Sequence, residues 1–232
     1  MLPDLVLVIS SYLFGSLPFM AALSGARGVS FSRGEDLHIA LWHNIGRLEA
    51  LAGIFVDLCK GTIPILIGIG FGFRLGVVAS AGVAAVAGQM WPVFQRFDGE
   101  KGNSTSLAMV ATLTIAYHSY LIFLIALIPM AIGAGIRTIP RFFAPGQTLN
   151  ERFKLGGPLS RSLPLGMATG FAIMPLTAWC LGQPLEMTLA LTTLFAIIMV
   201  RRLTAGLRAD LKTSSDVRRI LVNRLLYDRS FL

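Results

Sequence analysis

Residues 107–136 read LAMVATLTIAYHSYLIFLIALIPMAIGAGI. This apolar run is about 30 residues long, whereas a straight helix crosses a bilayer in about 20 residues. The polar segment from Tyr117 to Tyr120 interrupts the run near its middle. The run is therefore either one long tilted helix or two short helices joined by a polar turn.

The rest of the chain is also rich in apolar segments. Hydrophobic residues make up 54% of the chain and charged residues only 14%, whereas soluble domains carry about 25% charged residues. Five further segments are suited to membrane-crossing helices: residues 5–22, 50–72, 75–91, 163–182 and 187–200. The sequence predicts an all-α polytopic membrane protein.

The positions of the basic residues decide between the two readings of 107–136. With two helices there, the chain has seven spans, and four segments fall on one side of the membrane: 23–49, 92–106, 137–162 and the tail from residue 201. These segments hold every loop and tail lysine and arginine except Arg74. Because cytoplasmic loops carry an excess of Lys and Arg, we predict seven transmembrane helices with the N-terminus outside and the tail in the cytoplasm.

The chain divides into a seven-helix transmembrane domain, residues 1–200, and a basic cytoplasmic tail, residues 201–232. Leucines of the tail recur at helical spacing between arginines, which favours amphipathic helices on the inner leaflet over a solvated basic tail. The first segment has no basic region before it and no small-residue cleavage site after it, so we expect a retained span. The net charge of +8 fits anionic lipid headgroups, and aromatic interleaving typical of nucleic-acid binding is absent.

Residues 88–102 read GQMWPVFQRFDGEKG and follow directly on an apolar segment. Glycines let backbone N–H groups approach a ligand, and Lys101 beside them suggests a phosphate site at the membrane edge. A basic connecting loop held by lipid headgroups is the alternative. The hydroxyl residues from Ser104 to Ser106 are suited to start the next helix, whose free N–H groups favour an anion.

Other polar residues lie inside a predicted span, where a buried charge costs free energy, or in the first loop, where they are candidates for catalysis. Asp57 and Lys60 lie inside a predicted span, three residues apart and so on one helical face. They either pair with each other, or Lys60 points into the cytoplasmic site and Asp57 orients it. In the first loop His43 stands beside Asn44 and near Arg47, where it is a candidate general base or an ordinary surface histidine. Cys59 and Cys180 lie in separate spans, which argues against a disulfide and leaves too few ligands for a metal.

These residues resemble the acyl-phosphate-dependent glycerol-3-phosphate acyltransferases, the PlsY family. The resemblance covers about the first 110 residues. Four patches carry it in order: Tyr12 to Phe19; Asp36-Leu37 followed by Asn44-Ile45-Gly46; Asp57-Leu58-Cys59-Lys60-Gly61; and Gly88 to Thr105. The last aligns without a gap to a Gly-His-x-x-Pro-Val-Phe … Phe-x-Gly-Gly-Lys-Gly-x-Ala-Thr pattern.

The resemblance implies transfer of a fatty acyl group from acyl phosphate to glycerol 3-phosphate, which yields lysophosphatidic acid. It also implies a bacterial inner-membrane protein with seven spans, a site facing the cytoplasm and no metal or organic cofactor. The resemblance carries over Asn44 as a catalytic residue, and we expect His43 beside it to replace the family's missing base. The phosphate-binding positions that it carries over are Lys60, Gly99, Lys101, Gly102, Thr105 and Arg208, and Arg47 is a substitute for an arginine in a stretch that is shorter here than in the family.

The chain departs from the family pattern at several positions. Leu41, Trp42 and His43 stand where the family has Gly-Ser-Gly, Gln89 replaces a histidine, and Glu100 replaces a glycine. Two hypotheses follow: a divergent acyltransferase in which His43 replaces the missing base, or a non-catalytic relative that binds an anionic lipid or a partner. A small transporter or channel is a third hypothesis, for which only Asp57 and Lys60 mark a polar path through the bundle.

Overall fold

The computed structural model describes residues 1–28, 41–42, 44–146, 160–213 and 216–228, and its regular structure is helical. The helices are α1 (Leu2–Gly15), α2 (Phe19–Ala26), α4 (Arg47–Gly70), α5 (Leu75–Met90), η1 (Val93–Gln95), α6 (Asn103–Ala116), α7 (Leu121–Phe142), α9 (Ser162–Cys180), α10 (Leu185–Thr204), α11 (Leu207–Thr213) and α12 (Val217–Tyr227).

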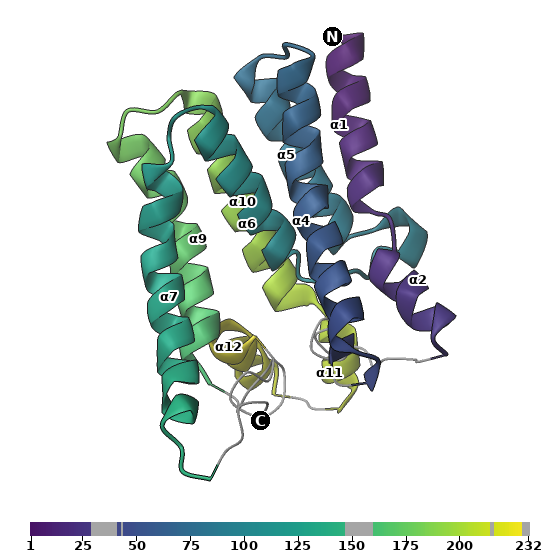
Figure 1. The fold of residues 1–232 in the computed structure, drawn as a ribbon, viewed down its shortest axis with the longest axis vertical. Helices are drawn as coiled ribbons and strands as arrows, with labels where there is room; N and C mark the ends of the chain where they lie inside the picture. The colour runs from purple at the N-terminus through teal and green to yellow at the C-terminus, as the bar shows by residue number, and fades with distance from the viewer. Residues whose placement is uncertain (29–40, 43, 147–159, 214–215, 229–232) are drawn as a thin grey trace.

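The long helices run side by side and alternate in direction along the chain (Figure 1). The N-terminus lies at the upper end in this view, together with the α4–α5, α6–α7 and α9–α10 turns. The short helices α2, α11 and α12 lie toward the lower end. We call this lower end the basic end, because the turns there and α12 carry Arg27, Arg96, Lys101, Arg161 and Arg224.

Six helical segments of the described chain are long and apolar enough to cross a membrane, so this is a multi-span helical membrane protein. They are Leu2–Ala26, Arg47–Gly70, Leu75–Gln95, Leu121–Pro140, Ser162–Cys180 and Leu185–Thr204. The predicted break in 107–136 is confirmed, since α6 ends at Ala116 and α7 begins at Leu121. The seventh crossing stays a prediction, because α6 has only 14 residues.

Two boundaries differ from the sequence prediction. The first span is not one continuous helix, because it breaks between Gly15 and Phe19. Pro18 lacks a backbone N–H and disfavours helical geometry at Leu17. At the other end of the chain, α10 continues past residue 200 to Thr204, so Arg201 and Arg202 lie in its last turn.

Close helix contacts bring the polar residues of separate spans together. A Cβ at Gly15 would overlap the backbone carbonyl of Ala85, and one at Gly61 would overlap that of Thr105. Small residues of this kind let membrane helices approach closely. α1 therefore packs tightly on α5, and α4 packs on the first turn of α6, beside Lys60.

Candidate functional site

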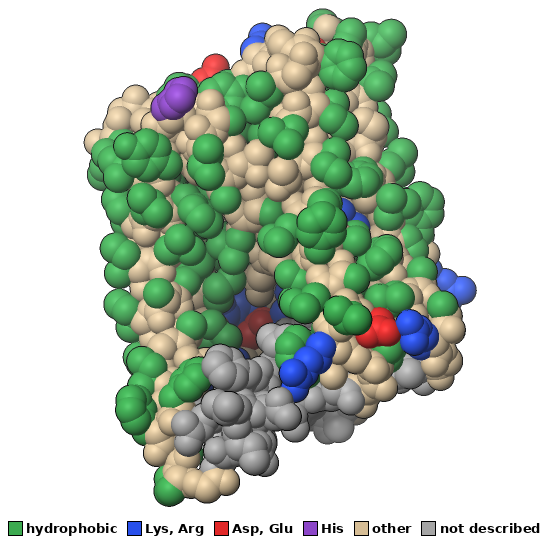
Figure 2. Space-filling view, in the orientation of Figure 1, with side chains coloured by type: hydrophobic (Ala, Val, Ile, Leu, Met, Phe, Trp, Pro, Cys, Tyr) green, Lys and Arg blue, Asp and Glu red, His purple; other side chains and the backbone are tan. Residues whose placement is uncertain are grey.

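Apolar side chains cover most of the visible face along the helices (Figure 2). Toward the basic end this face is hollowed, and acidic and basic side chains line the bottom of the hollow (Figure 2). Charged groups therefore gather at one end of an otherwise apolar bundle. At this basic end, polar contacts join the α5–α6 loop to α10 and α12.

The loop 91–102, which we call the glycine loop, folds back onto the end of α5. The amide of Gly99 donates to the carbonyl of Met90 at 3.2 Å, and the amide of Glu100 donates to the carbonyl of Gln89 at 3.1 Å. A Cβ at Gly99 would overlap the Gln89 carbonyl oxygen, so the close return requires glycine. The predicted phosphate-binding amide of Gly99 is thus engaged inside the loop.

Gly102 ends the loop and begins α6. Its φ of 69° is in the left-handed region, where glycine has no steric cost. A Cβ there would also lie 3.0 Å from Cε of Met90. The turn at Gly102 points the chain into α6, whose first amides form the N-terminal end of a helix next to Lys101.

Arg201, in the last turn of α10, holds the loop in place. Its guanidinium donates to Oδ1 of Asp98 at 3.0 Å and also to the carbonyl of Gly99. The Arg201 side chain is buried. Because a buried guanidinium with two partners has little freedom, Arg201 fixes the loop against the last turn of α10.

Lys101 reaches the C-terminal end of α12. Its Nζ lies 2.5 Å from Oδ2 of Asp228 and 3.1 Å from the Asp228 carbonyl oxygen. The Lys101 side chain is 34% exposed and that of Asp228 is 19% exposed. The lysine that the sequence predicts to bind phosphate therefore already holds an anionic group.

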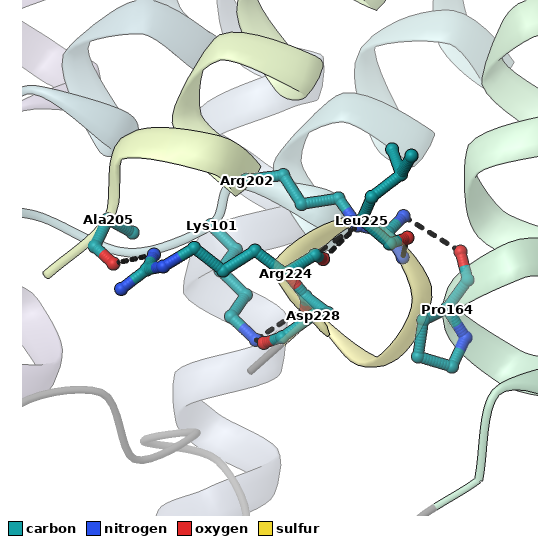
Figure 3. A network of polar contacts seen from close by, with 7 residues as sticks. All are labelled: Lys101, Pro164, Arg202, Ala205, Arg224, Leu225 and Asp228. Carbon is teal, nitrogen blue, oxygen red and sulfur yellow. Dashed lines mark hydrogen bonds and ion pairs between the residues drawn. The ribbon is translucent and has the colours of Figure 1, made fainter. Parts of the chain in front are cut away.

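α12 is held in place by Arg202, as Figure 3 shows. The guanidinium donates to three carbonyls, those of Pro164 at 2.8 Å, Arg224 at 3.2 Å and Leu225 at 2.8 Å. Its Nε also lies 3.8 Å from Oδ1 of Asp228. A cation at a helix C-terminus satisfies the last carbonyls and the helix dipole, so Arg202 joins α12 to α9 and α10.

Arg224 adds a second tie between the tail helices. It donates to the carbonyl of Ala205 and forms an ion pair with Asp210 of α11. Both charged side chains are buried. The tail is therefore anchored to the end of the bundle by its own buried charges, which the sequence pattern of a membrane-surface tail did not indicate.

Inside the bundle, Gln89 links the two charged residues of α4. Nζ of Lys60 donates to Oε1 of Gln89 at 2.5 Å, and Nε2 of Gln89 donates to Oδ1 of Asp57 at 3.1 Å. Lys60 also donates to the carbonyl of Leu17 at 2.7 Å. All three side chains of the bridge are buried.

The remaining predicted site residues are spread along the chain. Asn44 is exposed, and Arg47 is exposed at the start of α4 with its guanidinium 5.4 Å from the centre of the Trp42 ring. Thr105 is fully buried, and its hydroxyl has no hydrogen-bond partner among the described residues. His43 and the Arg208 side chain lie outside the described part of the chain.

Sequence reasoning missed four residues of this region: Arg201, Arg202, Arg224 and Asp228. A signal was present, because Arg201 and Arg202 directly follow the last apolar span. Their contacts lie far away in the sequence and could not be read from local spacing. Among the described residues, no cluster of three His, Cys, Asp or Glu side chains could hold a metal ion.

Solved structures resemble this chain in fold over nearly its full length. The crystal structure of PlsY (YgiH), an integral membrane glycerol 3-phosphate acyltransferase, in its lysophosphatidic acid form matches with a TM-score of 0.65 and 22% identity over 97% of this chain and 98% of the other. The glycerol 3-phosphate form matches with a TM-score of 0.65 and 24% identity over 96% and 94%. These similarities show a shared fold.

Curated relatives match about half of the chain in sequence. The chain is 33% identical to the glycerol-3-phosphate acyltransferase of Aquifex aeolicus over 52% of this chain and 66% of that protein. It is 36% identical to that of Pseudomonas putida over 45% of this chain and 58% of the relative. The matches thus span less than two thirds of these relatives. The family model for glycerol-3-phosphate acyltransferase matches residues 5–146, and the chain belongs to this family.

Proposed function

We propose that this protein transfers a fatty acyl group from acyl phosphate to a hydroxyl of glycerol 3-phosphate and so forms lysophosphatidic acid. We place the reaction at the cytoplasmic face of a bacterial inner membrane, with the basic end in the cytoplasm. One observation carries the proposal: Lys101 lies on a pinned glycine loop at the start of α6, in a member of this acyltransferase family.

The chemistry requires two phosphate-bearing molecules to meet beside a lipid bilayer. The hydroxyl oxygen of glycerol 3-phosphate attacks the acyl carbonyl carbon, and the bond from that carbon to the phosphate oxygen breaks. Inorganic phosphate leaves with the bonding electron pair, and the hydroxyl proton passes to a base. Fixed cations offset the charge of the two anions and orient them, which lowers the barrier.

The proposed roles follow the family positions except at His43 and Arg47, which stand in for residues that this chain lacks. His43 is the proposed base, with Asn44 beside it, and Lys101 is the proposed main phosphate ligand. The other proposed phosphate-binding residues are Arg47, Lys60, Gly99, Gly102, Thr105 and Arg208. The buried bridge of Lys60 and the engaged amide of Gly99 favour supporting roles for these two residues.

The test uses purified protein in detergent with palmitoyl phosphate and labelled glycerol 3-phosphate. We expect labelled lysophosphatidic acid from the wild type and a drop of about 100-fold or more in kcat/KM for Lys101→Ala, since fixed charges of this kind typically contribute that much. Arg96→Asn is the matched control, because it removes a charge from the same loop at an exposed residue with positive φ. A fully active Lys101→Ala enzyme would exclude the proposed site.

A second candidate function is a non-catalytic relative that binds an anionic lipid. The contact of Asp228 with Lys101 favours its non-catalytic part, because the candidate position for the substrate phosphate already holds a carboxylate. Folded wild-type protein that forms no product but retains anionic phospholipid through purification would support this function. Product formation that depends on Lys101 would exclude it.

A further inference from the structure

Gln89 is a buried polar residue that the proposed reaction does not use. It lies at the end of α5, where its side chain is 3% exposed. Its amide oxygen accepts from Lys60 and its amide nitrogen donates to Asp57. Its backbone carbonyl accepts from the amide of Glu100. One residue thus contacts both the buried charges of α4 and the glycine loop.

The bridge continues to the other end of the loop. Oδ2 of Asp57 accepts from the hydroxyl of Ser104 at 3.1 Å, in the first turn of α6. Lys60 is tied in turn to the carbonyl of Leu17 at the α1–α2 break. A single chain of hydrogen bonds therefore ties both ends of the segment 90–103 to α4 and to the α1–α2 break.

The position requires a group that donates and accepts at once. An ammonium group faces Oε1 and a carboxylate faces Nε2, so the side chain must accept on one side and donate on the other. Glutamate would add a second buried negative charge beside Asp57, and leucine would leave both charges without this partner. Neutral histidine carries one donor and one acceptor and can make the same bridge.

We infer that Gln89 is a positioning residue, which fixes the loop 98–102, and with it Lys101, by bridging Lys60 and Asp57. The inference rests on the proposed function, because Lys101 is the group whose position matters to the reaction. A purely structural role would change the amount of folded protein but not the activity per folded molecule. A positioning role changes the activity and the mobility of the loop.

The first measurement is steady-state kinetics on Gln89→His, Gln89→Glu and Gln89→Leu in the same detergent. For Glu and Leu we expect kcat/KM for glycerol 3-phosphate to fall by about 10- to 100-fold, the usual effect of losing a supporting contact. Gln89→His should retain most of the activity. Gln183→Leu is the matched control, because it makes the same change at the opposite end of the bundle, where Gln183 accepts from Ser119.

The second measurement is hydrogen exchange of the loop amides, which needs no reaction. We expect the amides of Gly99 and Glu100 to exchange faster in the Glu and Leu variants and at the wild-type rate in Gln89→His and Gln183→Leu. If Gln89→Leu does not fold, the nearly isosteric Gln89→Glu still tests whether Gln89 positions the loop. Wild-type kcat/KM and wild-type exchange in folded Gln89→Glu would overturn the inference. An inactive wild type would remove the proposed function, while the exchange rates would still decide whether Gln89 holds the loop.

Discussion

The carboxylate of Asp228 contacts Lys101, the residue that we propose binds the substrate phosphate. The 2.5 Å ion pair and the contact with the Asp228 carbonyl leave an incoming phosphate in competition with the protein's own anion. Asp228 can hold this position because it ends α12 in the left-handed conformation, with a φ of 57°. The affinity of the site for phosphate therefore depends on how easily this carboxylate is displaced.

We expect Asp228→Asn to lower the KM for glycerol 3-phosphate by about 2- to 5-fold, since a partly exposed ion pair contributes up to about 1 kcal/mol. The measurement is the steady-state KM at fixed palmitoyl phosphate. Asp228→Glu, which keeps the charge, is the control and should stay close to the wild type. A raised KM in Asp228→Asn would mean that the carboxylate supports the site instead of competing with the substrate.

Gly102 should be intolerant of any side chain. An alanine there adopts a left-handed conformation that costs about 1–2 kcal/mol, and its Cβ lies 3.0 Å from the Met90 side chain. We expect Gly102→Ala to lower the thermal unfolding temperature in detergent. Gly25→Ala is the control, because no atom lies within 4 Å of its Cβ position; an equal loss in both variants would contradict this reasoning.

At the scale of elements, α12 depends on one buried guanidinium. Three carbonyls from two helices converge on Arg202, so its removal leaves all of them without that donor. We expect Arg202→Met to release α12 and to speed limited proteolysis of residues 207–228 by chymotrypsin. Arg218→Ala, at an exposed position of the same helix, should be cleaved like the wild type. Equal cleavage of Arg202→Met and the wild type would show that other contacts hold α12.

The elements themselves were largely predictable from the sequence. The long apolar run and its polar segment left one or two helices open, and the distribution of basic residues over the whole chain favoured the break between α6 and α7. The break before α2 was missed although Pro18 marks it, because the apolar pattern continues through the proline. A helix end that depends on a single residue was thus harder to predict than a membrane span that depends on many apolar residues.

The site was predictable only in its local part. The glycine loop with Lys101 is contiguous, so its pattern is visible in the sequence. The ion pair of Lys101 with Asp228 joins residues 127 positions apart, and the bridge of Gln89 joins two helices. Asp57 and Lys60 share a helical face as predicted, but the partner that links them comes from α5, which no spacing rule within α4 could reveal.

At the scale of the whole molecule, the charge distribution predicts orientation. Arg74, which is highly exposed, lies at the end opposite to the basic end. In a variant with Cys59→Ala and Cys180→Ala, we expect Arg74→Cys to react with a membrane-impermeant maleimide in spheroplasts. Arg96→Cys should react only after the membrane is permeabilised. The reverse pattern would invert the proposed topology and place the site outside the cytoplasm.

The length of α6 sets a depth within the membrane. Its 14 residues rise about 21 Å at about 1.5 Å per residue, whereas the hydrocarbon core is about 30 Å thick. Figure 1 shows the α6–α7 turn among the turns of the upper end and α6 beginning well above the lower ends of α4 and α7. Because α6 is shorter than the hydrocarbon core is thick, Lys101, which lies just before the start of α6, lies deeper along the bundle than the lower ends of α4 and α7. A water-soluble phosphate must enter the membrane to the depth of Lys101, whereas the phosphate of a lipid-tailed donor already lies close to that depth.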